Sequence, residues 1–257
     1  MGREHAVDNA ESPRDYPRLE GESGTDGSAG AVVRHAPALA GRAREILAHL
    51  EAGLAALPEV LGLPAPELEA LVVDDADWEA APRDNHRPYP RGLPYFTRAS
   101  DPPALVVPEE LSEAIQPRTP ATLPLVVNHE LAHAFLAGEV AARTPAWLRE
   151  LPPQAASAAV ARREGLPLDE HLAQIPGPGF TIRGFRTPAD AAGQMAFQNL
   201  LLALGAAMLE EFGEDSLRRL VGALREEEAV GEARAEEILA AALGDGGREW
   251  LASREEF

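Results

Sequence analysis

The sequence predicts an α+β protein, with a small mixed sheet followed by a half built from helices. Short runs rich in β-branched and aromatic residues, bounded by Pro, Gly and Asp, occur between residues 68 and 110. From about residue 119 onward, apolar residues recur at helical spacing instead. Hydrophobic residues make up 45% of the 257 residues and charged residues 25%. This is the composition of a soluble globular chain long enough to bury a core.

The N-terminal segment differs in composition from the rest of the chain. Residues 1–34 are polar, acidic and rich in Gly, Ser and Pro, so they are predicted to be a disordered tail. Residues 35–257 are predicted to form one domain. Within it, 35–118 would contribute a helix and the sheet, and 119–257 the helical half. The helix is predicted over 36–57, where Leu and Ile recur at helical spacing.

Three strands are predicted between this helix and the helical half. They are LEALVVDD (68–75), GLPYFTR (92–98) and PALVVPEE (103–110). A helix start is expected at Asp75, directly after the first strand. Together these segments predict a sheet of at least three strands.

The helical half begins with the stretch RTPATLPLVVNHELAHAFLAGEV. Thr119-Pro120 and Thr122 are start signals, and Gly138 is a stop signal. An apolar helix is therefore predicted between these two points.

A second helix is predicted after it, with Thr144 as N-cap and Pro145 at the first helical position. Pro152 and Pro153 lack backbone N–H donors, so we expect the helix to kink or restart there. Further helical segments are predicted at 188–213, 215–228 and 236–244.

Charge and cysteine content narrow the function classes. The formal net charge is −19, and all 23 basic residues are Arg. This balance argues against nucleic acids and anionic membrane surfaces as partners. The chain has no cysteine, so any bound metal must be held by His and carboxylate groups. No apolar leader and no apolar run of about 18 residues is seen, which predicts a soluble, cytoplasmic protein without excluding export.

The stretch NHELAH (128–133) contains the candidate metal-binding and catalytic residues. A helix advances about 100° per residue, so His133 lies about 40° and Glu130 about 100° from His129. All three therefore share one face. Two imidazoles one turn apart suit two corners of a zinc tetrahedron, and Glu130 is placed to deprotonate a metal-bound water.

A zinc site of this kind needs a third protein ligand. Glu150 is the first candidate, because it lies on the next predicted helix, which a short loop joins to the first. Two helices connected in this way pack against each other, which would bring Glu150 back over the histidines. The alternatives are Asp169, Glu170 and His171 in LDEH.

HELAH followed by PAWLRE resembles the gluzincin group of zinc metallopeptidases. The predicted strands at 92–98 and 103–110 look like the edge-strand region that precedes the zinc helix in that group. The C-terminal helices and Trp250 resemble the tail of bacterial peptidase-MA-like domains. The resemblance covers roughly residues 68–250 and implies a zincin-like fold.

The resemblance also implies the roles of the residues. His129, His133 and Glu150 would bind Zn²⁺, and Glu130 would act as general base in peptide-bond hydrolysis. The peptide or protein substrate would lie antiparallel to an edge strand.

Gluzincins typically stabilise the oxyanion with a Tyr or His downstream of the third ligand. Here every tyrosine precedes the zinc helix. His171 is therefore the predicted stabiliser, with Arg183 and Arg186 as alternatives. Two other functions stay open: a catalytically impaired zincin-like domain with a structural or vestigial metal site, acting as a binding or regulatory module, and a zinc hydrolase acting on a non-peptide amide.

Overall fold

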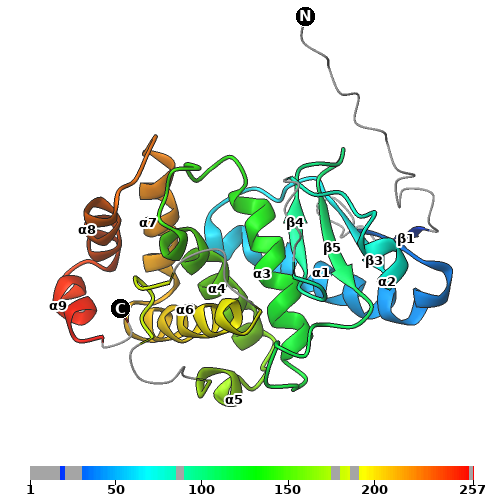
Figure 1. Ribbon diagram of the computed structural model, residues 1–257. Coiled ribbons are helices and arrows are strands. Elements are labelled where there is room, and N and C mark those ends of the chain that lie inside the picture. The colour runs from blue at the N-terminus through cyan, green and yellow to red at the C-terminus, as the bar shows by residue number, and fades with distance from the viewer. Residues whose placement is uncertain (1–17, 21–30, 85–89, 175–179, 186–190, 255–256) are drawn as a thin grey trace, which may run out of the picture.

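A computed structural model describes residues 18–20, 31–84, 90–174, 180–185, 191–254 and 257. Within these residues the fold is α+β, as predicted, and the C-terminal half is mostly helical. Helix α3 lies between the sheet and the helical half (Figure 1). The strands are β1 (Arg18–Glu20), β2 (Val32–His35), β3 (Glu69–Val73), β4 (Tyr95–Thr97) and β5 (Ala104–Pro108). The helices are η2 (Pro37–Leu39), α1 (Ala40–Leu61), α2 (Asp75–Trp78), α3 (Thr122–Leu136), α4 (Ala146–Arg163), α5 (Asp169–Leu172), α6 (Ala191–Phe212), α7 (Glu214–Arg225), α8 (Glu232–Leu243) and α9 (Gly247–Ala252).

The described strands form one sheet in the order β1-β2-β3-β5-β4. Strands β2, β3 and β5 are parallel, and β1 and β4 pair antiparallel at the two edges. Both central strands are buried along their whole length, and alternate residues of β3 and β5 face two separate apolar clusters. The predicted strands are confirmed as β3, β4 and β5. Strand β4 is the edge that faces α3.

The boundary of the predicted tail is wrong at its C-terminal end. Val32–His35 is strand β2, and Val33 is fully buried there. A run of four residues is too short to be recognised as a strand from its sequence alone. Here β2 is stabilised by its pairing with β3. Strand β1 also falls within the predicted tail. Residues 1–17 and 21–30 lie outside the described residues.

Helix α3 packs against both α1 and α4. The crossing with α1 is close: a Cβ on Gly53 would lie 2.2 Å from Oδ1 of Asn128. Only glycine allows this approach without a shift. The helix that carries the HELAH motif is therefore packed closely against α1.

Helix α4 runs without a break through Pro152 and Pro153, so the predicted restart is wrong. Each proline removes one backbone hydrogen bond. The segment is nevertheless buried between α3 and α6, and tertiary packing of this kind supplies most helical stability in proteins. The predicted N-cap is also corrected: Pro145 is the cap residue, and the buried Thr144 hydroxyl has no hydrogen-bond partner among the residues that the structure describes.

Helix α6 is the one described helix that is long and apolar enough to span a membrane. Half of its most apolar window is buried inside the protein. Leu200, Leu201 and Leu204 belong to the core that α6 shares with α4. These residues of α6 are therefore part of the hydrophobic core.

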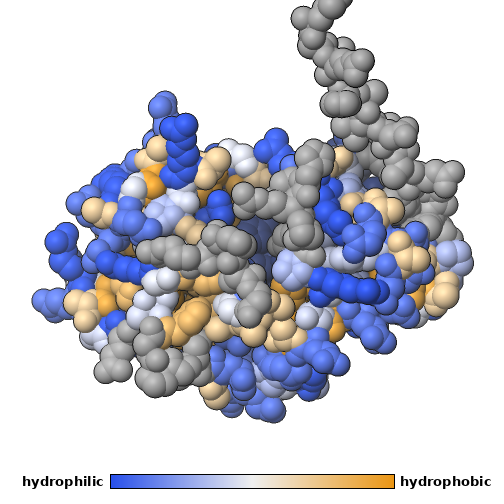
Figure 2. All heavy atoms as spheres, viewed as in Figure 1, coloured by the Kyte–Doolittle hydropathy of each residue, from blue (hydrophilic) through white to orange (hydrophobic). Residues whose placement is uncertain are grey.

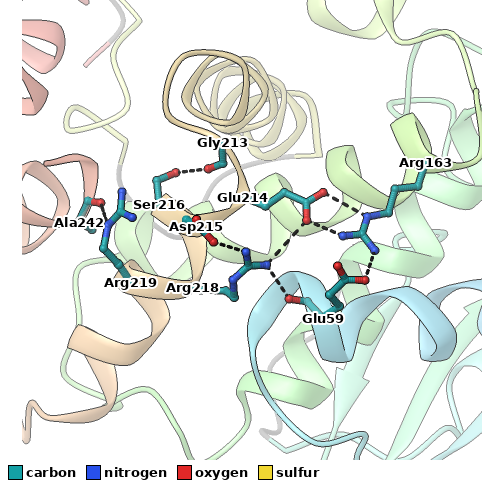
Figure 3. A network of polar contacts seen from close by, with 9 residues as sticks. All are labelled: Glu59, Arg163, Gly213, Glu214, Asp215, Ser216, Arg218, Arg219 and Ala242. Carbon is teal, nitrogen blue, oxygen red and sulfur yellow. Dashed lines mark hydrogen bonds and ion pairs between the residues drawn. The ribbon is translucent and has the colours of Figure 1, made fainter.

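A network of ion pairs joins the C-terminal end of α4 to α1 and α7 (Figure 3). Arg163 donates to Glu214 at 3.1 and 2.5 Å and to Glu59 at 2.9 Å. Arg218 donates to the backbone oxygen of Glu59 at 2.8 Å. Water screens exposed pairs of this kind, so each one adds little to the stability of the fold.

Candidate metal centre

A cleft opens over α3, between the segment before β4 and helix α6. Figure 2 shows the surface hollowed at this place. His129 and Glu130 line it from α3, Gln154 from α4, and Gln194 and Gln198 from α6. Apolar side chains, among them Leu125, Val126 and Leu202, form the rest of its wall. The sheet edge, the motif helix and the helical half therefore meet at one cavity.

His129, His133 and Glu150 meet beside this cleft. Nε2 of His133 lies 3.2 Å from Nε2 of His129 and 3.1 Å from Oε2 of Glu150. The same oxygen of Glu150 lies 3.5 Å from Nε2 of His129. These are the residues that the sequence placed together, and among the described residues they form the one group able to hold a metal ion.

The separations fit a tetrahedral metal centre. With metal–ligand bonds of about 2.0–2.1 Å, two ligand atoms at the corners of a tetrahedron lie about 3.3–3.4 Å apart. The three observed separations, 3.1, 3.2 and 3.5 Å, bracket this value. The two imidazole rings meet edge to face, with their planes at 87° and their centroids 4.7 Å apart, so they are not stacked. The three side chains therefore offer a donor set and separations that suit a bound metal ion.

Electrostatics favour positive charge at the same point. Burial alone would raise the pKa of Glu150, but the facing His133 and His129 hold it well below its usual range. Burial would likewise lower the pKa of His133, and the carboxylate of Glu150 outweighs it and raises that pKa. An ionised Glu150 thus attracts a cation, which is either a proton on His133 or a metal ion.

Glu130 lies beside the cluster and not within it. Its Oε1 is 3.9 Å from Nε2 of His129, and its Oε2 accepts a hydrogen bond of 2.9 Å from the backbone N–H of Phe96. Its residue surface is 9% exposed, and this burial raises its pKa above the ordinary carboxyl value. A buried carboxylate with a raised pKa next to a metal position is a candidate proton acceptor.

Three contributions to the site were not predicted from the sequence. Phe96 acts through its backbone, which no residue pattern reveals. Gln198 on α6 donates through Nε2 to Oε2 of Glu150 at 3.0 Å, and Gln154 donates to Oε1 of Gln198 at 2.6 Å. Gln154 follows Glu150 by one helical turn, and this spacing was the one feature of the sequence that placed Gln154 on the same face of the helix as Glu150.

The alternative third ligands do not reach the histidines. His171 belongs to α5, and its Nε2 forms a hydrogen bond of 2.8 Å with Oγ1 of Thr119 at the start of α3. Asp169 and Glu170 are exposed. The structure thus brings Glu150, and not the LDEH group, to the metal cluster.

The predicted oxyanion stabilisers lie at different places. His171 is 5% exposed and lines the same cleft as Glu130. Arg183 pairs with Glu236 at 2.8 Å, and Arg186 lies outside the described residues. The stabilising role of His171 therefore stays a prediction.

No protein-family model and no curated protein sequence matches this chain. The assignment of the site accordingly rests on the geometry of its own residues.

Proposed function

We propose that the protein is a zinc-dependent metallopeptidase. The observation that carries this proposal is the arrangement of His129, His133 and Glu150 at tetrahedral separations, with the Glu130 carboxylate beside them. A two-histidine, one-carboxylate set is a donor set of catalytic zinc, which keeps a fourth position open. Zinc bound by such ligands lowers the pKa of a coordinated water and polarises a carbonyl oxygen.

The protein's own residues would supply proton transfer and orientation. Glu130 is the proton acceptor for the attacking water, because its carboxylate is buried and held against the cluster by the N–H of Phe96. After the attack the same carboxyl would carry the proton to the leaving amine. The packing of α3 between α1 and α4 keeps these groups in register.

Edge strand β4 supports a peptide as substrate. It borders α3, and among the described strands it pairs with β5 alone. An extended peptide can add to such an edge antiparallel, and its backbone then lies between the strand and the metal position. The apolar wall of the cleft suits an uncharged side chain of that peptide.

A catalytically impaired metal-binding domain is the second candidate. It is favoured by the absence of any tyrosine after Tyr95, which leaves His171 as the oxyanion donor. Loss of one such donor costs about 10²–10³ in rate. Such a protein would bind zinc as tightly as an active one and would cleave slowly or not at all.

The test compares wild type with Glu130→Gln and with the matched control Glu211→Gln, an exposed residue of α6. Zinc content is measured by elemental analysis and cleavage with a broad peptide library. We expect about one zinc per chain in all three proteins, cleavage by wild type and E211Q, and none by E130Q. Zinc binding without any cleavage by wild type would favour the impaired domain, and a zinc-free wild type would overturn both.

A further inference from the structure

We infer that Gln198 is a positioning residue that aims the Glu150 carboxylate at the metal, and that Gln154 fixes Gln198 in that role. This inference rests on the proposed metal site and extends it by a chain of two carboxamides. The chain runs from α4 to α6 and returns to α4, ending on Glu150. It concerns how one ligand is oriented, which the ligand set itself does not determine.

The contact falls on the oxygen that matters. Nε2 of Gln198 donates at 3.0 Å to Oε2 of Glu150. That same atom lies 3.1 and 3.5 Å from the ring nitrogens of His133 and His129. A hydrogen bond to this oxygen fixes the last torsion of the Glu150 side chain, which is otherwise soft. It thereby selects the rotamer in which one oxygen faces both histidines.

The direction of the chain is forced by chemistry. An ionised carboxylate only accepts hydrogen bonds, so Gln198 must turn its NH₂ group toward Glu150. Its carbonyl oxygen then faces the opposite way, where Nε2 of Gln154 donates to it at 2.6 Å. Gln154 is 8% exposed and Gln198 is half-buried, so this contact is partly buried. If the carboxamide of Gln198 were flipped, its oxygen would face the carboxylate oxygen of Glu150 and its NH₂ group would face the NH₂ group of Gln154. Neither contact could form a hydrogen bond.

The backbone is built for this chain to form. A Cβ on Gly205 of α6 would lie 2.9 Å from Cα of Ala155 on α4, so the two helices touch almost backbone to backbone. Gln154 precedes Ala155 directly, and Gln198 lies two turns before Gly205 on α6. The close crossing brings side chains of both helices within hydrogen-bond reach beside the cleft.

A merely structural role for the two glutamines makes a different prediction. If they only joined α4 to α6, their loss would lower stability and leave metal affinity unchanged. If they aim Glu150, affinity for the metal falls even when the fold is intact. Outer partners of metal ligands typically contribute about 10- to 100-fold in affinity.

The experiment measures Zn²⁺ affinity by competition with a chelator, for full-length wild type, Gln198→Met, Gln154→Met and the double variant. Met keeps the volume and removes the hydrogen bonds. Gln174→Met, at an exposed site on the α5 side, is the matched control. Thermal unfolding of each metal-free protein is recorded in parallel.

We expect Q198M to bind Zn²⁺ about 10- to 100-fold more weakly than wild type and Q174M to bind like wild type. Q154M should lose less, because Gln198 still reaches Glu150. The double variant should match Q198M, since Gln154 acts only through Gln198; additive losses would overturn the relay. If Q198M binds Zn²⁺ as tightly as wild type does, the inference is overturned and the proposed metal site is retained. If wild type binds no Zn²⁺, both the inference and the proposed metal site are overturned. If Q198M does not fold, unchanged affinity in Q154M overturns the part of the inference that concerns Gln154.

Discussion

The backbone N–H of Phe96 donates a hydrogen bond of 2.9 Å to the carboxylate of Glu130, and so ties the sheet edge to the motif helix. Phe96 is the central residue of β4, whose other side pairs with β5. Its N–H points toward Glu130 on α3. The candidate proton acceptor is thus held by a group that a substrate peptide would also seek when it adds to this edge.

Removing this N–H tests its contribution. Phe96→Pro deletes the donor, and a proline is tolerated at an edge position whose N–H is not used in the sheet. Phe96→Ala is the control, because it loses the ring and keeps the N–H. We expect F96P to retain zinc and to hydrolyse peptides about 10-fold more slowly than F96A, since a poorly aimed base loses part of the 10²–10⁴ that such catalysis supplies. Equal kcat/KM for F96P and F96A would contradict this role.

Zinc should stabilise the fold through the histidine pair. A ligand at about 100 times its Kd that binds only the folded state adds about 2.7 kcal/mol, which for a chain of this size is about 5–10 °C in Tm. We expect this rise when zinc is added to metal-free wild type, and its reversal by chelator. His133→Ala should abolish it, because one of three ligands is gone. His49→Ala, half-buried on α1 and outside the cluster, should keep the full rise; an equal rise in H133A would remove the metal site.

The group of candidate metal ligands was predictable because its geometry is mostly local. His129 and His133 share a face through helical periodicity alone, and Glu150 follows on the next helix. Sequence left the third ligand open between Glu150 and LDEH, and the packing of α3 on α4 decided it.

The remainder was set by contacts distant in sequence. Strand β2 exists because β3 pairs with it, and α4 passes Pro152 and Pro153 because packing on both sides outweighs two lost hydrogen bonds. Gln198 lies 48 residues from Glu150, and its role follows only from the close crossing of α4 and α6. No periodicity within either segment encodes that crossing.

Two helical glycines should respond to alanine with opposite signs. A Cβ at Gly205 would meet Ala155 of α4 at 2.9 to 3.0 Å, mostly against backbone atoms that cannot turn away. We expect G205A to lower the free energy of unfolding by about 1–3 kcal/mol through overpacking. At Gly222 on α7 nothing lies within 4 Å, so G222A should raise it by about 0.5–1 kcal/mol through helix propensity alone. Urea unfolding of the metal-free proteins measures both, and a stabilised G205A would show that the crossing is looser than described.

His171 should make stability depend on pH in a defined direction. Burial lowers its pKa below the ordinary value of 6.5, although neighbouring Glu170 acts in the opposite sense. The unfolded chain therefore takes up a proton at higher pH than the folded chain does. Stability from the neutral ring is complete above pH 6.5 and is lost as pH falls toward the lower folded pKa, at no more than about 1.4 kcal/mol per pH unit.

The matched variant is His171→Gln, which keeps a polar group facing Thr119 and cannot titrate. Free energies of unfolding are measured by urea at about pH 7.5, 6.5 and 5.5, with chelator present so that metal binding does not contribute. The two proteins differ only at residue 171, so the contributions of all other groups cancel in the difference between them. We expect wild type to lose more stability than H171Q between the upper and the lower pH. Parallel curves, or a relative gain by wild type in acid, would show that burial does not keep the ring of His171 neutral.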